Sequence, residues 1–128
     1  MGLAAAALTL WGCYRAGILL SGPKAGLIAA AIWALMSGDV MLQANQPNVE
    51  VFMNAALIWA FVWMLKAQRG RTGVGVYALV GALFFAATLY KHYVAIAAVL
   101  MVGMHLWDMV RQGAFSWGDA FRKGAVAV

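Results

Sequence analysis

Apolar runs of about helix length follow one another along the whole chain, separated by short polar segments. Of the 128 residues, 66% are hydrophobic and 10% are charged, whereas a soluble domain carries about 25% charged residues. A soluble fold of this length cannot bury so much apolar surface. The surplus must face lipid, and the sequence therefore predicts an all-α, polytopic bundle of transmembrane helices.

The apolar runs predict about four full spans and a partial N-terminal helix. The run 3–14 corresponds to roughly 18 Å of helix, which is too short to cross a bilayer alone. A loop or short interfacial helix is expected over 15–24, because a Ser-Gly-Pro break interrupts this segment. We interpret 1–128 as a single transmembrane region belonging to a larger membrane domain. The full spans are expected at 25–42, 48–65, 74–90 and 93–109.

The longest polar interruption, Gln43–Asn54, is predicted to form a tight corner between the first two full spans. Pro47 prevents a continuous helix here, because it lacks a backbone N–H and clashes with the preceding turn. The only glutamate of the chain, Glu50, falls in the first turn of the span that follows. Asn54 lies one turn deeper on the same helix face.

Basic residues are concentrated in alternate breaks between the spans. Short loops rich in Lys and Arg are usually cytoplasmic, which predicts an integral membrane protein with its basic loops on the cytoplasmic side. Such short clusters do not form the continuous basic surface that nucleic acid requires, so no nucleic-acid partner is expected. The outer side is predicted to hold one base, Lys91, together with Asp39, Glu50 and His92. If four spans alternate, the other eight of the nine bases share the inner side: Arg15, Lys24, Lys66, Arg69, Arg71, Arg111, Arg122 and Lys123.

Glu50 and Lys91 are the first candidates for a functional site. Glu50 suits the positive end of a helix dipole, but it also fits a carboxylate in an outward-facing polar pocket, and both interpretations remain open. Lys91 suits the C-terminal end of a span, yet a lone outer ammonium can also hold a phosphate. His92 and Tyr93 can donate hydrogen bonds to the same anion. No close spacing of metal ligands is present, so no metal site is predicted.

Three segments resemble GT-C membrane glycosyltransferases of the protein-mannosyltransferase and aminoarabinose-transferase type, including the RgtA/B/C/D-like bacterial enzymes. The first, YRAGILLSGPKAGLIAAAIWALMS, resembles a helix end, a short basic stretch and the start of a Gly/Ala-rich helix. The second, QPNVEVFMNAALIWAFVWMLKA, is similar to a corner where an acidic residue opens an apolar span. The third, GVYALVGALFFAATLYKHYVAIAAV, resembles a glycine-containing span that ends in lysine.

The resemblance implies inverting transfer of a sugar from a polyprenyl-phosphate donor on the extracytoplasmic face, and it implies a location in a bacterial inner membrane. By position, Glu50 matches the second acidic position of the family, and Lys91 matches its lysine near the lipid phosphate. Lys91, with His92 and Tyr93, would then stabilise the departing phosphate. Glu50 and Asn48 would orient the donor head group or the acceptor.

This sequence departs from the family pattern in two ways. Tyr90 stands where a small or hydroxyl residue is more usual before the lysine. The first family helix and the outer loop with its catalytic aspartate have no counterpart, so the expected base lies outside this chain. The implied partners are membrane lipid, the polyprenyl-phosphate sugar, and missing N- and C-terminal parts of the same protein. A divalent metal cofactor is left open.

A small, non-enzymatic multi-span protein, acting as a transporter piece or an assembly subunit, would share the same spans and basic loops. A lipid-binding or scaffold protein is a third possibility, for which Lys91 would be dispensable. The enzyme hypothesis predicts that Glu50 and Lys91 converge on one cavity open to the outer side. A plain subunit predicts that the two side chains are separated and solvated.

Overall fold

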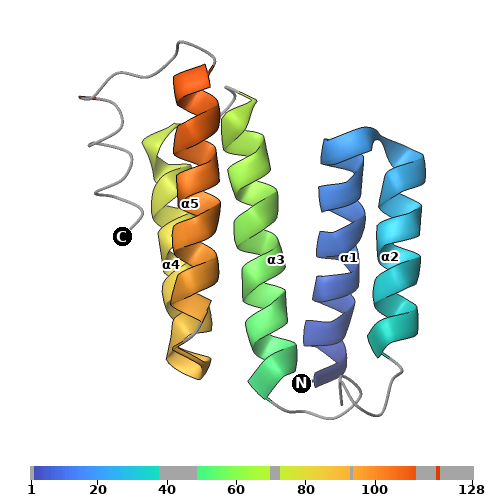
Figure 1. Ribbon diagram of the computed structural model, residues 1–128. Helices are drawn as coiled ribbons and strands as arrows, with labels where there is room; N and C mark the ends of the chain where they lie inside the picture. Colours follow the sequence, from blue (N-terminus) through green and yellow to red (C-terminus); the bar gives the residue numbers. More distant parts are fainter. Residues whose placement is uncertain (1, 38–48, 70–72, 93, 112–117, 119–128) are drawn as a thin grey trace.

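The computed structural model describes residues 2–37, 49–69, 73–92, 94–111 and 118. The described residues form helices that lie side by side in a bundle, and α1, α3 and α5 run in one direction while α2 and α4 run in the other (Figure 1). This arrangement confirms the predicted all-α fold. The helices are α1 Gly2–Ser21, α2 Pro23–Ser37, α3 Val49–Gln68, α4 Val74–Tyr90 and α5 Val94–Arg111.

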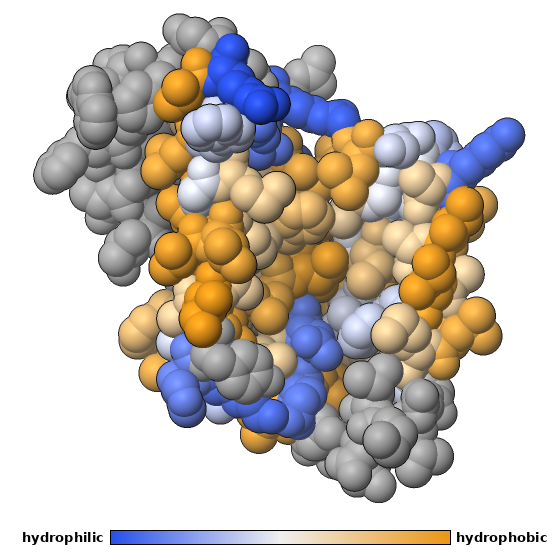
Figure 2. Space-filling model, viewed as in Figure 1, coloured by the Kyte–Doolittle hydropathy of each residue, from blue (hydrophilic) through white to orange (hydrophobic). Residues whose placement is uncertain are grey.

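Three of these helices are long and apolar enough to cross a membrane. They are α1 and α3, with 20 residues each, and α5, with 18. α2 and α4 are also apolar but have 15 and 17 residues. Hydrophobic side chains cover the middle of the face shown in Figure 2, and hydrophilic residues gather toward its two ends. The described helices are therefore those of an integral membrane protein.

α1 is longer than the sequence predicted. In place of a partial helix at 3–14 and a loop or interfacial helix at 15–24, α1 continues through Arg15 to Ser21. The prediction took Arg15 as the end of the helix, but a long arginine side chain can stay in a helix while its charge reaches the boundary. The break is confined to Gly22, whose φ of 93° suits glycine alone. Pro23 then occupies the first position of α2, where its missing N–H costs nothing.

Most other helix ends lie close to the predicted ones, and the predicted end of the first full span, at 42, lies outside the described residues. α4 occupies the range predicted for the third span, and α3 ends three residues beyond its predicted 48–65. α5 runs to Arg111, two residues beyond the predicted 93–109, and α2 begins two residues before the predicted 25–42. Several predicted features lie outside the described residues, namely the corner around Pro47 with Asn48, the acid Asp39, Tyr93, and the bases Arg71, Arg122 and Lys123.

Glycine backbones bring α1 and α2 into direct contact. A Cβ added to Gly17 would lie 2.7 Å from the carbonyl oxygen of Ala25, and one added to Gly26 would lie 2.8 Å from the carbonyl oxygen of Tyr14. Real Cβ atoms do not approach a backbone this closely, so both positions require glycine. Small residues let membrane helices approach closely enough for such packing.

α3 packs against both halves of the bundle. On one side, Trp59 Nε1 donates a hydrogen bond to the Leu8 carbonyl of α1 over 3.1 Å. On the other side, α3 and α4 share a buried cluster of Ala60, Met64, Val80 and Phe84, against which side chains of α5 are packed. α3 is therefore the central helix, and its two ends reach both ends of the bundle (Figure 1).

Candidate site at the Glu50 and Lys91 end of the bundle

The structure brings Glu50 and Lys91 together. Glu50 lies in the first turn of α3, and Lys91 is the C-cap of α4, so both belong to helix ends that meet at one end of the bundle (Figure 1). Lys91 Nζ donates a hydrogen bond to Glu50 Oε1, which makes the pair a salt bridge. The Lys91 and Glu50 side chains are 34% and 37% exposed, so a solute at this boundary can reach both.

The end of α4 directs the Lys91 side chain. The backbone of Lys91 is extended, with φ −149° and ψ 117°, although its N–H still donates to the Ala87 carbonyl over 3.3 Å. Its own carbonyl accepts from the N–H of Val94 over 3.1 Å, which starts α5 almost at once. Such a short reversal leaves Lys91 at the tip of the α4–α5 connection, beside the start of α3.

Packing beneath the ion pair holds the helix ends in place. Met53, Ala87 and Val94 form a buried cluster contributed by α3, α4 and α5. The rings of Phe52 and Tyr90 are stacked, with 6.3 Å between their centroids. Tyr90, the departure from the family pattern, therefore has a packing role next to the lysine. These contacts make the convergence of Glu50 and Lys91 a property of the fold.

The remaining predicted site residues are placed only in part. His92 is exposed on the connection after Lys91, and its carbonyl accepts a hydrogen bond from the N–H of Ala95 over 3.1 Å. Asn48 and Tyr93 lie outside the described residues. Within the part of the chain that the structure describes, no three His, Cys, Asp or Glu side chains are grouped to hold a metal ion.

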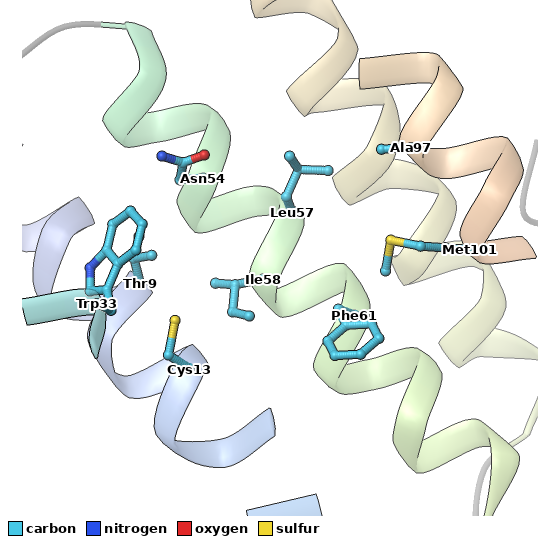
Figure 3. A pocket seen from close by; sticks show the side chains of 9 residues that line it. All are labelled: Thr9, Cys13, Trp33, Asn54, Leu57, Ile58, Phe61, Ala97 and Met101. Carbon is cyan, nitrogen blue, oxygen red and sulfur yellow. The ribbon is translucent and has the colours of Figure 1, made fainter. Parts of the chain in front are cut away.

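An apolar cavity of about 310 Å³ opens one helical turn deeper than Glu50. α3 forms its floor from Asn54 to Phe61, α1 and Trp33 of α2 form one wall, and Ala97 and Met101 of α5 form the other (Figure 3). The carboxamide of Asn54 lies near the indole of Trp33 in this view. Sequence reasoning placed Asn54 on the face of Glu50 but missed the cavity, because its walls come from helices distant in sequence.

The described bases other than Lys91 lie toward the opposite end of the bundle. Lys66 lies over the Trp63 ring, with Nζ 3.9 Å from its centroid, and Arg111 lies 5.3 Å from the ring of Trp107. Arg69 donates a hydrogen bond to a carbonyl near the end of α1. Cation and indole pairs of this kind are typical of a membrane–water boundary. Which of the two ends faces the cytoplasm stays a prediction.

At this opposite end of the bundle, two polar contacts join α5 to α4 and to α3. The Tyr77 hydroxyl and His105 Nε2 lie 3.3 Å apart, with both side chains buried. Gln68 Nε2 donates to Asp108 Oδ2 over 3.3 Å. His105 and Asp108 thus take part in contacts that join α5 to α4 and α3. Sequence reasoning missed Tyr77, for which the hydroxyl within the apolar first half of α4 was the available signal.

Comparison of the chain with protein-family models, with curated proteins and with solved structures found no match. The resemblance to GT-C glycosyltransferases therefore stays a prediction that depends on three sequence segments. The structure contributes the geometry of the two charged residues that those segments contain.

Proposed function

We propose that the chain is part of an integral-membrane glycosyltransferase, which moves a sugar from a polyprenyl-phosphate donor to an acceptor on the extracytoplasmic face of the membrane. The observation that carries the proposal is the contact between Lys91 and Glu50, which lie 41 residues apart in sequence. They meet at the end of the bundle opposite the other described bases. The enzyme hypothesis predicts that the two side chains converge on one cavity; they contact each other, and the cavity that begins one turn below Glu50 is lined by neither of them. The contact supports the proposal because a plain subunit was expected to keep the two charges apart.

The chemistry assigned to Lys91 is electrostatic. Loss of a polyprenyl phosphate from a sugar leaves negative charge on the phosphate oxygens, and a nearby ammonium stabilises that charge as it develops. The phosphate competes with the Glu50 carboxylate for the same N–H donors. As Lys91 turns toward the phosphate, Glu50 becomes available to accept a hydrogen bond from a sugar or acceptor hydroxyl. The proposal leaves the general base outside the described residues.

The ion pair can also be explained by a second candidate, a non-enzymatic multi-span membrane protein such as a transporter piece or an assembly subunit, although separated side chains were predicted for it. Opposite charges at the ends of apolar helices neutralise each other when they pair, and pairing lowers the cost of holding them near lipid. On this view the pair only joins α3 to α4. The two candidates differ in what happens when both charges are removed together.

The experiment is therefore the neutral double variant Glu50→Gln/Lys91→Met, compared with Lys91→Met alone. Binding of polyprenyl phosphate is measured against binding of the uncharged polyprenol, by native mass spectrometry of the protein in detergent. Sugar transfer is assayed in membranes containing the protein expressed from its full reading frame. Lys24→Ala, which removes an exposed base from the opposite end, is the matched control.

The glycosyltransferase proposal expects both Lys91 variants to lose transfer and the preference for phosphate, with membrane insertion unchanged. The non-enzymatic alternative expects the double variant to match the wild type and only the single variant to be destabilised, because only the single variant leaves Glu50 unpaired. If Lys91→Met retained sugar transfer, Lys91 would not be the group that stabilises the departing phosphate.

A further inference from the structure

Three basic side chains gather where the ends of α3 and α5 meet. Gln68 Nε2 of α3 donates a hydrogen bond to Asp108 Oδ2 of α5 over 3.3 Å, which brings these two helix ends together. Arg69 follows Gln68 directly, and Arg111 lies one turn beyond Asp108 on the same side of α5. The N–H of Arg69 donates to the carbonyl of Lys66 over 3.2 Å, so these two bases are also one turn apart. Lys66, Arg69 and Arg111 together form the cationic cluster.

The described carboxylates do not neutralise the cationic cluster. The salt bridge of Lys91 with Glu50 lies at the other end of the bundle, and no base of the cationic cluster forms one with a described residue. Asp108 is the one acid described at this end, and its carboxylate accepts from Gln68. At the other end the charges of Lys91 and Glu50 cancel. The described part of the chain therefore carries its excess positive charge where α3 and α5 end.

Helix dipoles account for only part of this charge. α3 and α5 both end here, and a base is favourable beside the negative end of a helix. Arg69 makes such a contact, because its guanidinium donates to the Leu19 carbonyl near the end of α1. A helix end contributes only about half of an elementary charge, however, and a guanidinium has several N–H donors. The cationic cluster can therefore still bind a full external anion.

Two tryptophan rings indicate the depth of the cationic cluster in the membrane. Lys66 Nζ lies 3.9 Å from the centroid of the Trp63 ring, and Arg111 Cζ lies 5.3 Å from that of Trp107. Indole rings prefer the level of the lipid head groups. Arg69 and Arg111 are exposed at this level. The anions within reach of these bases are therefore the phosphates of surrounding lipids.

Net charge decides which lipid the bases select. Phosphatidylcholine carries an ammonium group next to its phosphate, so its head group is neutral as a whole. Phosphatidylglycerol carries the phosphate charge alone. A Lys or Arg near the membrane surface favours an anionic lipid by about 1 kcal/mol, which is a factor of about five in binding.

We propose that the cationic cluster binds one anionic phospholipid, whose phosphate is held between the ends of α3 and α5. Arg69 presents the planar fork of N–H donors that suits a phosphate, and Lys66 and Arg111 add positive charge beside it. α5 has few buried residues, so the bridging phosphate fastens this helix to α3. The lipid lies at the opposite end of the bundle from Lys91, and its binding does not depend on the proposed sugar transfer.

The test is a competition between phosphatidylglycerol and phosphatidylcholine with identical acyl chains, for binding to the protein in detergent. Native mass spectrometry reads the ratio of the two lipids in the form with one lipid bound. The wild type should prefer phosphatidylglycerol, and Arg69→Gln and Arg111→Gln should each lower the ratio about fivefold. Equal binding of the two lipids by the wild type would overturn the proposal.

Lys24→Gln is the matched control, because it removes an exposed base of α2 at the same end of the bundle but outside the cationic cluster. Its lipid ratio should stay near the wild-type value. If Lys24→Gln lowered the ratio as much as Arg111→Gln, the attraction would be a diffuse effect of net charge, and no site would exist.

Arg111→Gln also keeps the test independent of folding defects. Arg69 contacts α1 as well, so its loss can loosen the bundle, whereas Arg111 lies over Trp107 of its own helix. Added phosphatidylglycerol should raise the unfolding temperature of the wild type more than phosphatidylcholine does, and Arg111→Gln should lose most of this difference. The same difference in Arg111→Gln and the wild type would show that the lipid does not fasten α5 through this cluster.

Discussion

The α1–α2 hairpin and the α4–α5 hairpin are built from similar apolar sequences but are held together differently. Backbone touches backbone at Gly17 and Gly26 in the first hairpin. α5, in contrast, has fewer buried residues than α1 or α3, and it is joined to its neighbours by contacts such as Tyr77–His105. Close glycine packing leaves no room for a ligand between α1 and α2. Looser packing around α5 leaves apolar grooves beside it.

The largest expected effect comes from breaking the glycine contact. Gly17→Ala places a methyl group 2.7 Å from a backbone carbonyl and should destabilise the protein by about 3 kcal/mol or more, because the backbone must move. Thermal unfolding in detergent measures the effect. Gly103→Ala in α5 is the matched control, since an added Cβ meets nothing within 4 Å. It should stabilise the protein slightly, through the higher helix propensity of alanine. Equal shifts in both variants would contradict the comparison.

A smaller effect is expected where a glycine meets a side chain. A Cβ added to Gly12 would lie 2.6 Å from Cγ2 of Ile58, which can adjust. Gly12→Ala should therefore cost about 1–2 kcal/mol, within the usual range for overpacking. Adding Ile58→Ala, which removes both γ carbons that the new methyl group would meet, should relieve the clash, so the double variant should lose less stability than the sum of the two single variants. Unfolding temperatures of the single and double variants show whether recovery occurs, and a purely additive result would place the strain elsewhere.

The contact between Tyr77 and His105 should contribute less to the stability of the protein than the close packing at Gly12 does. Tyr77→Phe keeps the ring and removes the hydroxyl, so its expected cost is about 0.6 kcal/mol, the average for such contacts between membrane helices. The local consequence is a weaker hold on α5, which hydrogen exchange of α5 amides can detect. Faster exchange confined to α1 and α2 would show that this contact does not secure α5.

The smallest effect is expected for the indole hydrogen bond from Trp59 to the Leu8 carbonyl. Trp59→Phe removes one exposed donor, and water or lipid head groups can replace it at the carbonyl. We expect a loss of about 0.5 kcal/mol or less, because the glycine contacts already hold α1. Thermal unfolding of Trp59→Phe and Tyr77→Phe measures both losses of stability. A larger loss in Trp59→Phe would mean that α1 depends on its hydrogen bond more than α5 does, which contradicts the comparison.

Helix positions could be predicted from the sequence, because apolar runs bounded by Gly, Pro and charged residues have few other solutions in lipid. The distribution of charges between the spans also separates Lys91 from the other bases. The predicted length of α1 was wrong because the sequence does not distinguish an arginine inside a membrane helix from an arginine at its end. The rotation of each helix could not be predicted, since helices that are apolar on all sides have no preferred face. The pairing of Tyr77 with His105 and the walls of the cavity below Glu50 depend on that rotation.

The turn at Gly22 has a consequence for how the chain enters a membrane. Only this one residue lies between α1 and α2, so no segment is available there to form a soluble loop or to accept an inserted domain. We expect the two helices to enter the bilayer together as a hairpin, since neither can be held back while the other inserts. A tag inserted after Gly22 should therefore impair biogenesis of the protein, even though the position is at a helix boundary.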